Sequence, residues 1–244
     1  MLAHLQISKC ISIPKVGQHG SEATSGTVTV ETTSQRRARQ KLQRRHEIIE
    51  AAIELWATKG SRGTGLAEVA ERAGMTHAGV LHHFGSKANL LLAVMEERDR
   101  RDRAILQPYF DRSDLRHLWD HYPDVARANE REMGLAQLFV VLIGESITPN
   151  NVGHEYLQDR YRFVRGRTQA ILESSQHGGE IDADVDCGAT ASQIVAFMDG
   201  ALIQWLVDPQ PGLLVASYEH FFERLAETIG LGPATTNGRS RSRT

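Results

Sequence analysis

One short stretch of the chain carries side chains that could read the edges of nucleic-acid bases. The imidazole of His77 can exchange a hydrogen bond with a base in the major groove, and Ala78 or Leu81 can contact a thymine methyl group. A helix packed inside a core would carry larger apolar side chains than those of Thr76, His77 and His82. These positions therefore indicate a helix that presents one face to a polar partner.

Two short helices must position these side chains. Apolar residues recur at helical spacing over residues 66–73, and Gly74 follows in the place where a helix often ends in a left-handed residue. Thr76 can cap the next helix, which would bury Val80 and Phe84. Two helices this short, joined at a glycine, match a helix-turn-helix that binds DNA. An ordinary helical hairpin inside a core is the alternative.

The distribution of charge along the 244 residues agrees with a polyanionic partner. The net charge is −2, but residues 36–87 hold ten Lys or Arg against five Glu, and residues 104–244 hold twelve against nineteen Asp or Glu. A basic arm from Arg36 to Arg45 could add phosphate or minor-groove contacts to the helix-turn-helix. A solvated run of charges before a helix is an equally good interpretation of this arm.

The composition excludes several other classes of protein. Cys10 and Cys187 are too few for a disulfide framework and lack metal-ligand spacing, so we expect a reduced, cytoplasmic setting. The longest apolar run, residues 138–143, is too short to span a bilayer, and the first residues lack the apolar segment of a signal peptide. No membrane partner is therefore expected.

Neither a metal ion, a cofactor nor a catalytic site is predicted. Adjacent helical residues point in different directions, which counts against a metal site at His82 and His83. The aspartates at positions 182, 184 and 186 lack the glycine and the glutamate of a calcium loop. The sequence also lacks a phosphate-cradling glycine loop, a nucleophile elbow and the paired histidines of a zinc hydrolase.

Helical periodicity over most of the chain predicts an all-α fold with two domains. An N-terminal three-helix domain with the helix-turn-helix would cover residues 36–90, and a larger C-terminal domain for ligand binding and dimerisation would cover residues 91–231. Residues 1–35 and 232–244 are polar and lack a sustained helical period, so we expect them to be disordered. The native start could alternatively lie downstream, near Val28 or Val30.

The expected helices follow the apolar spacing. One helix buries a stripe from Ile48 to Trp56 and precedes the helix-turn-helix. The helix after the motif starts at Ser86, carries the charged run EERDRRDR, and ends at Pro108. We expect this charged run to be exposed, because its mixed signs suit a helix that connects two bodies. Further helices are expected at residues 113–130, 132–147, 154–177, 188–207 and 212–229.

The last two helices predict an interface with a second copy of the chain. The stretch from Ile194 to Val207 is apolar nearly all round and should be covered on both sides, and the last helix carries one apolar stripe. The core of a single monomer is the alternative. The expected interface residues are Ile194, Ala201, Trp205, Leu214, Tyr218, Phe221 and Leu225.

The region around the helix-turn-helix contains, in order, the segments IIEAAIELWATKG, LAEVAERAGM and VLHHFGSKANLLLAVME. Their order and spacing resemble the tetracycline-repressor (TetR) family of one-component bacterial regulators. Further along, LFVVLIGES, HEYLQDRYRFVRGR and MDGALIQWLVDP are similar to the C-terminal part of one of its actinobacterial-type branches. The resemblance implies an all-helical homodimer with an N-terminal DNA-binding domain and a C-terminal effector domain.

The resemblance also implies roles for individual residues. The recognition helix would run from Thr76 to His83, with Lys87 on a phosphate at the next helix N-terminus and Thr64 in the loop that approaches the DNA backbone from the other side. Leu81 stands where the family often has an aromatic hydroxyl, and Gly65 where it often has Ser or Thr. The expected DNA-binding residues are Arg44, Arg45, Thr64, Thr76, His77, Ala78, Leu81, His82 and Lys87.

An effector pocket is expected between helices of the C-terminal domain, where a mostly apolar cavity would hold a small lipophilic or amphipathic molecule. Glu145 and Arg165 could orient a polar group of this effector or face water. The expected lining residues, for each of which plain core is the alternative, are Trp119, Phe139, Ile143, Tyr161, Val164 and Phe197.

Together these features predict a ligand-responsive transcriptional regulator. It would be a repressor that a small-molecule effector releases from a near-palindromic operator in double-stranded DNA. A DNA-binding regulator without a small-molecule effector, either an activator or a protein controlled by a partner, is the first alternative. A helical enzyme or carrier with a vestigial DNA-binding segment is the second.

Overall fold

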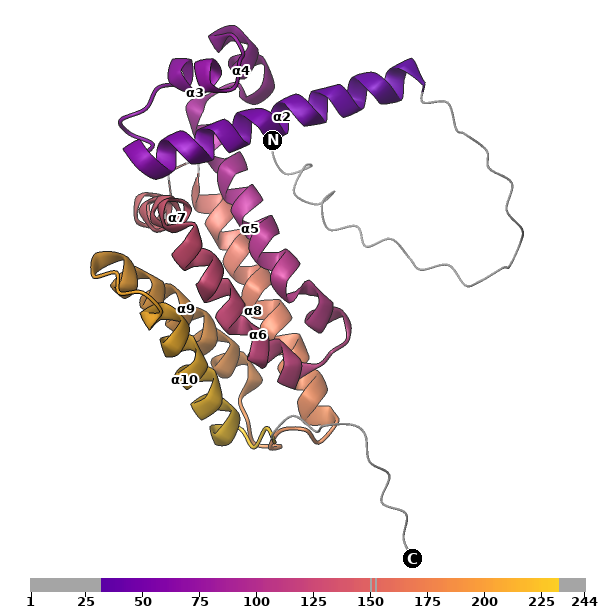
Figure 1. Cartoon of the computed structure of the whole chain (residues 1–244). Helices are drawn as coiled ribbons and strands as arrows, with labels where there is room; N and C mark the ends of the chain where they lie inside the picture. Colours follow the sequence, from indigo (N-terminus) through magenta and orange to yellow (C-terminus); the bar gives the residue numbers. More distant parts are fainter. Residues whose placement is uncertain (1–31, 150, 152, 233–244) are drawn as a thin grey trace, which may run out of the picture. The chain divides into compact units, whose positions relative to one another are not determined.

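The computed structural model describes residues 32–149, 151 and 153–232 of a chain with two compact units, Met1–Arg39 and Gln40–Thr244. Residues 1–31 and 233–244, which belong to the two segments expected to be disordered, lie outside the described residues, and so does Cys10. The described part is helical and contains no strand, which confirms the all-α prediction (Figure 1). The helices are α2 (Thr33–Lys59), α3 (Leu66–Arg72), α4 (His77–Phe84), α5 (Lys87–Asp111), α6 (Leu115–Arg131), α7 (Met133–Ser146), α8 (Gly153–His177), α9 (Cys187–Val207) and α10 (Leu213–Thr228).

The described part of the first unit is the beginning of α2. The N–H of Thr32 donates to Oε1 of Gln35 (2.8 Å), and the N–H of Gln35 donates to the hydroxyl of Thr32 (3.3 Å). This reciprocal pair is a capping box, which satisfies two backbone donors at a helix start. The helix therefore begins at Thr33, inside the segment expected to be disordered, and the basic arm from Arg36 to Arg45 is helical.

Within the second unit, the C-terminal half of α2 packs with α3 and α4 as the helix-turn-helix prediction requires. The stripe from Ile48 to Trp56 is buried, as is Val80 of α4. Gly74 has a φ of 63° between α3 and α4, a left-handed conformation that a glycine adopts without strain. The hydroxyl of Thr76 accepts the N–H of Gly79 (3.1 Å) and caps α4.

Helix α5 differs from its prediction in two respects. It continues through Pro108 to Asp111. A proline near the end of a helix removes one backbone hydrogen bond, and this loss is offset because Tyr109 beyond it packs against the core. Its charged run is not an exposed connector, since Arg98 is only 4% exposed and Asp99 only 7%. These charges lie among the other C-terminal helices, which give them partners.

The C-terminal helices α5 to α10 share one core (Figure 1). α6 contacts both α5 and α10, and α9 contacts both α8 and α10. The rings of Tyr122 in α6 and Phe222 in α10 stack with centroids 4.4 Å apart. The carboxylate of Glu130 in α6 accepts the N–H groups of Gly212 and Leu214 (3.2 Å each) and so anchors the start of α10.

Among the described residues, helix α9 is covered on one side only. Just 33% of its most apolar stretch is buried, although the sequence indicates cover all round. By length and composition α9 could also cross a membrane, a weak signal that buried helices of globular domains share. Its contacts with α8 and α10 make it a helix of this core with one open apolar face.

Candidate functional site

Helix α4 presents one face of small and polar side chains. Its opposite side is buried through Val80 and Phe84, and Leu81 is half-buried at the edge. The exposed residues of this face are Thr76, His77, Ala78 and His82. The structure thus brings these predicted DNA-binding residues together on one surface, and their contact with DNA stays a prediction.

The start of α5 lies beside this surface. The hydroxyl of Ser86 accepts the N–H of Asn89 (3.1 Å), and the side-chain amide of Asn89 donates to the carbonyl of Phe84 (2.9 Å). These bonds fix the end of α4 to the start of α5. Lys87 is therefore held at a helix N-terminus, where the backbone N–H groups add to its attraction for a phosphate.

The two arginines predicted to contact DNA have different surroundings. The half-buried Arg45 places its guanidinium 4.3 Å from the centroid of the Phe84 ring, so it joins α2 to α4. Arg44 is exposed and pairs with Glu47 (2.7 Å). Burial, followed by the positive charges nearby, lowers the pKa of His83 below its usual value.

Thr64 was predicted to bind DNA from a loop that approaches the DNA backbone, and its contact with DNA stays a prediction. Thr64 is fully buried, and its hydroxyl donates to the carbonyl of Gly60 (3.2 Å), which turns the loop after α2 inward. Arg62 in the same loop is exposed and pairs with Glu145 of α7. Glu145 therefore faces this loop instead of an effector.

A cluster of buried charges, which no sequence pattern predicted, lies between α5, α6 and α8. Asp99 accepts hydrogen bonds from Nε of Arg160 (2.9 Å) and from the hydroxyl of Tyr156 (2.6 Å). Arg98 donates through Nη2 to the side chain of Asn129 (3.0 Å). Charges in a low-dielectric interior need such partners, and here they come from helices far apart in the sequence.

Two guanidinium groups of this cluster flank the ring of Phe139, at 4.0 Å for Arg98 and 4.5 Å for Arg160 from its centroid. Nη1 of Arg98 lies 3.3 Å from a carboxylate oxygen of Asp102, yet it has no aligned hydrogen-bond partner among the described residues. Burial raises the pKa of Asp102, and the charge of Arg98 offsets part of this rise. A buried guanidinium nitrogen of Arg98 that lacks an aligned hydrogen-bond acceptor thus lies against the ring of Phe139.

The residues predicted to line an effector pocket are divided between two places. Phe139 and Tyr161 lie at the buried charges, and Tyr161 donates its hydroxyl to Asp199 (2.6 Å). Trp119 and Phe197 instead pack against aromatic side chains of α10. Ile143 and Val164 are half-buried, as are Tyr161 and Phe197, whereas Trp119 and Phe139 are buried.

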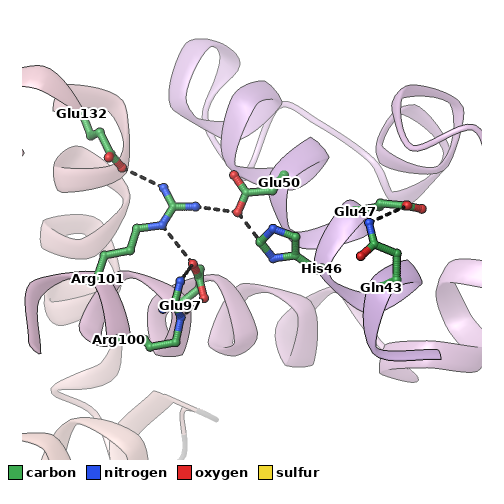
Figure 2. A network of polar contacts seen from close by, with 8 residues as sticks. All are labelled: Gln43, His46, Glu47, Glu50, Glu97, Arg100, Arg101 and Glu132. Atoms are coloured by element: carbon green, nitrogen blue, oxygen red, sulfur yellow. Dashed lines mark hydrogen bonds and ion pairs between the residues drawn. The ribbon is translucent and has the colours of Figure 1, made fainter. Parts of the chain in front are cut away.

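Arg101 of α5 joins three carboxylates (Figure 2). Its guanidinium donates through Nε to Glu97 (3.0 Å), through Nη1 to Glu132 before α7 (3.0 Å), and through Nη2 to Glu50 of α2. Hydrogen bonds from Arg100 and then Arg101 lower the pKa of Glu97 to about 2. Through this one side chain, α5 is tied both to α2 and to the start of α7.

His46, Glu50 and Glu97 place their potential ligand atoms within 4.8 Å of one another, as a metal site would. The guanidinium of Arg101 donates to both of these carboxylates (Figure 2). It supplies the positive charge that a metal ion would otherwise bring. The arrangement is therefore that of an ion-pair network.

A groove of about 420 Å³ lies on the surface of α9 and α10, in the region of the predicted dimer interface. The interface itself stays a prediction, although some of its residues are buried in the chain's own core, where Trp205 and Leu214 still line the groove. The buried ones are Ile194, Trp205, Leu214 and Tyr218, and the half-buried ones are Ala201, Phe221 and Leu225. Ile203, Val207 and Leu213 are instead the large apolar side chains exposed on these helices.

Two family models match the chain. The model for bacterial regulatory proteins of the tetR family matches residues 48–94, and the model for the C-terminal part of BetI-type transcriptional repressors matches residues 111–230. This chain belongs to the TetR family. It is a DNA-binding transcriptional regulator whose helix-turn-helix is formed by α3 and α4.

Similar proteins extend over most of the chain. TtgR of Pseudomonas putida, an HTH-type transcriptional regulator, is 26% identical over 225 residues, which cover 82% of this chain and 98% of that protein. The structure of SmeT, the repressor of the Stenotrophomonas maltophilia multidrug efflux pump SmeDEF, has a TM-score of 0.64 at 20% identity and covers 81% of this chain and 97% of its own. The structure of FadR from Bacillus subtilis, in complex with stearoyl-CoA, has a TM-score of 0.64 at 18% identity. It covers 75% of this chain and 98% of its own. Both structures share the fold of this TetR-family regulator.

Proposed function

We propose that this TetR-family regulator is a repressor that acts in the cytoplasm on a near-palindromic operator. The observation that carries the proposal is the exposed face of α4, with Lys87 held beside it. Lys87 and the basic arm would neutralise phosphates, and His77 would contact a base edge. Arg45 would act mainly by holding α4 through Phe84.

The repressor would work as a homodimer through α9 and α10. Apolar side chains that stay exposed together mark a surface that binds another protein, and Ile203, Val207 and Leu213 meet this description beside the groove. A dimer presents two copies of α4, one to each half-site. The centres of the half-sites would then lie about one helical turn of DNA, or a multiple of it, apart.

The effector would be a small amphipathic molecule that parts α5, α7 and α8 on binding, because the void next to Arg98 holds only about 20 Å³ in this arrangement. Nη1 of Arg98 offers it a buried hydrogen-bond donor, and the ring of Phe139 offers an apolar surface next to that donor. A molecule with an acceptor group, such as a carboxylate or carbonyl, on an apolar body fits this pair. Such a ligand releases the operator only if it binds the DNA-free arrangement more tightly than the DNA-bound one.

An electrophoretic shift assay on the intergenic DNA upstream of the chain's own gene tests this function. The protein without ligand should give a sequence-selective shift that weakens as salt rises, because phosphate contacts release counterions. A thermal-stability screen against amphipathic molecules should identify a ligand that raises the melting temperature and abolishes the shift. Without a selective shift the repressor proposal fails. A shift that no stabilising ligand releases would favour control by a partner protein.

A further inference from the structure

Helices α2 and α7 approach each other closely at a glycine. A Cβ atom placed on Gly134 of α7 would lie 2.6 Å from both the Cα atom and the carbonyl oxygen of Ala57 in α2. Cβ atoms do not come so close to backbone atoms, so a larger residue at this position must push the two helices apart. Gly144, also in α7, would meet nothing within 4 Å. The close approach therefore depends on Gly134 specifically.

An ion-pair clamp holds the same two helices close to this contact. Glu50 precedes Ala57 by about two helical turns, so both side chains lie on one face of α2. Glu132 immediately precedes α7, at whose start Gly134 lies. Arg101 donates to both carboxylates (Figure 2). The contact and the clamp together fix one face of α2 on the start of α7.

The position of α2 determines the position of α4. The guanidinium of Arg45 stacks on Phe84, and the buried stripe of α2 belongs to the same core as Val80 of α4. Packed interiors transmit a displacement because they have few voids to absorb it. A shift of α2 relative to α7 therefore also moves the exposed face of α4. We call this face, with Thr76, His77, Ala78 and His82, the recognition surface.

The clamp also borders the buried charges of the C-terminal domain. A void of about 20 Å³, which has room for one water molecule, lies among Arg98, Asp102 and Arg101. Glu132 and Asn129 line the same void. Any change in the hydrogen-bond partners of Arg98 would therefore occur beside the ion pair between Arg101 and Glu132.

We propose that the Gly134–Ala57 contact and the Arg101 clamp position the DNA-binding helices on the C-terminal domain, and thereby set the separation of the two recognition helices in the dimer. This inference rests on the proposed dimeric repressor. It makes Gly134 and Arg101 positioning residues, which act on DNA binding through α2 without touching DNA. These two residues would then determine which spacing of the operator half-sites the dimer prefers.

Full-length Gly134→Ala and Gly144→Ala variants test the proposal on an operator that the wild-type protein selects from random double-stranded DNA. Fragments with the selected half-site spacing, and with one base pair more or fewer, serve as probes. Gly134→Ala should lose about tenfold in affinity for the selected spacing and should discriminate less against an altered one. Its affinity for non-specific DNA and its salt dependence should not change. Gly144→Ala should behave as the wild type.

A folded Gly134→Ala protein with wild-type affinity and wild-type spacing preference would overturn the proposal. If circular dichroism shows that this variant does not fold, Arg101→Gln and Arg101→Lys decide instead. Arg101→Gln should shift the spacing preference, and Arg101→Lys should retain part of it through its charge. An unchanged preference in Arg101→Gln would likewise overturn it. Failure of the wild-type protein to select any sequence would contradict the repressor itself, which is a different result.

Discussion

The recognition surface has few side chains that are long enough to read a base. The hydroxyl of Thr76 accepts the N–H of Gly79 as a helix cap, and Leu81 is half-buried where relatives of this fold often carry an aromatic hydroxyl. Ala78 can offer only its methyl group. Among these side chains we expect the imidazole of His77 to read a base, with His82 as the other exposed imidazole of this face, so the contribution of His77 should be measurable.

His77→Ala should lower the affinity for the selected operator by about tenfold, since one good base contact contributes roughly 1–3 kcal/mol of discrimination. The dependence of affinity on salt should not change, because no phosphate contact is lost. Competition binding with the operator and with random DNA measures both quantities. His220→Ala, at an exposed position of α10, is the control. An equal loss on random DNA would show that His77 does not read a base.

Glu97 should make the stability of the protein depend on pH in the acid range. Hydrogen bonds from Arg100 and then Arg101 lower its pKa from 4.5 to about 2. A carboxyl group whose pKa is lower in the folded state stabilises the fold above its unfolded pKa, and this stabilisation is lost as the pH falls from about 4.5 towards 2. Glu97→Gln should therefore melt at a lower temperature at pH 7 and lose less stability on acidification. Melting curves between pH 7 and pH 3 check this, with Glu155→Gln as the control, and parallel pH profiles would contradict it.

At the scale of helices, the apolar spacing predicts most of the fold. Each predicted helix is present, and the turn at Gly74 and the cap at Thr76 follow from local residue types alone. The start of α2 was missed although its signal was present, because the polar composition before Arg36 concealed the capping box of Thr32 and Gln35. Local signals of this kind can be read from one segment at a time.

The charged run of α5 could not be interpreted from the sequence in this way. Alternating signs suit a solvated helix, and the partners that bury Arg98 and Asp99 lie on α6 and α8, far along the chain. The side chain of Thr64 also depends on tertiary structure, since the loop geometry decides whether its hydroxyl faces DNA or Gly60. The positions of the helices follow from apolar spacing, whereas the burial of the charged run depends on partners that no single segment contains.

The charges buried along α5 predict a large effect of one substitution. Arg98→Met keeps much of the apolar stem against Phe139 but removes the positive charge next to Asp99 and Asp102. Breaking a buried pair by removing one partner costs about 3–5 kcal/mol, because the remaining charge is left uncompensated. Urea unfolding should show a loss of this order, whereas Arg103→Ala, at an exposed position of α5, should stay close to the wild type. A loss below about 1 kcal/mol would mean that the cluster relaxes or hydrates.

For the whole molecule, the uneven charge explains which side approaches DNA. Residues 36–87 are basic and contain the recognition surface, whereas residues 104–244 are acidic and are repelled by phosphates. A single copy of α4, however, offers few base contacts. Two copies joined through the open face of α9, as proposed, would bind two half-sites at once and so compensate for the few base contacts of each copy.

Ile203→Asp should separate the proposed dimer, because it places a charge on the large apolar surface beside the groove of α9 and α10. Sedimentation should then show a monomer. Affinity for the operator should fall by about a hundredfold or more, since the second half-site no longer binds at a high effective concentration. Val141→Asp puts the same charge at an exposed position of α7 and should leave both properties unchanged. A dimer of Ile203→Asp with wild-type operator affinity would place the interface on another surface.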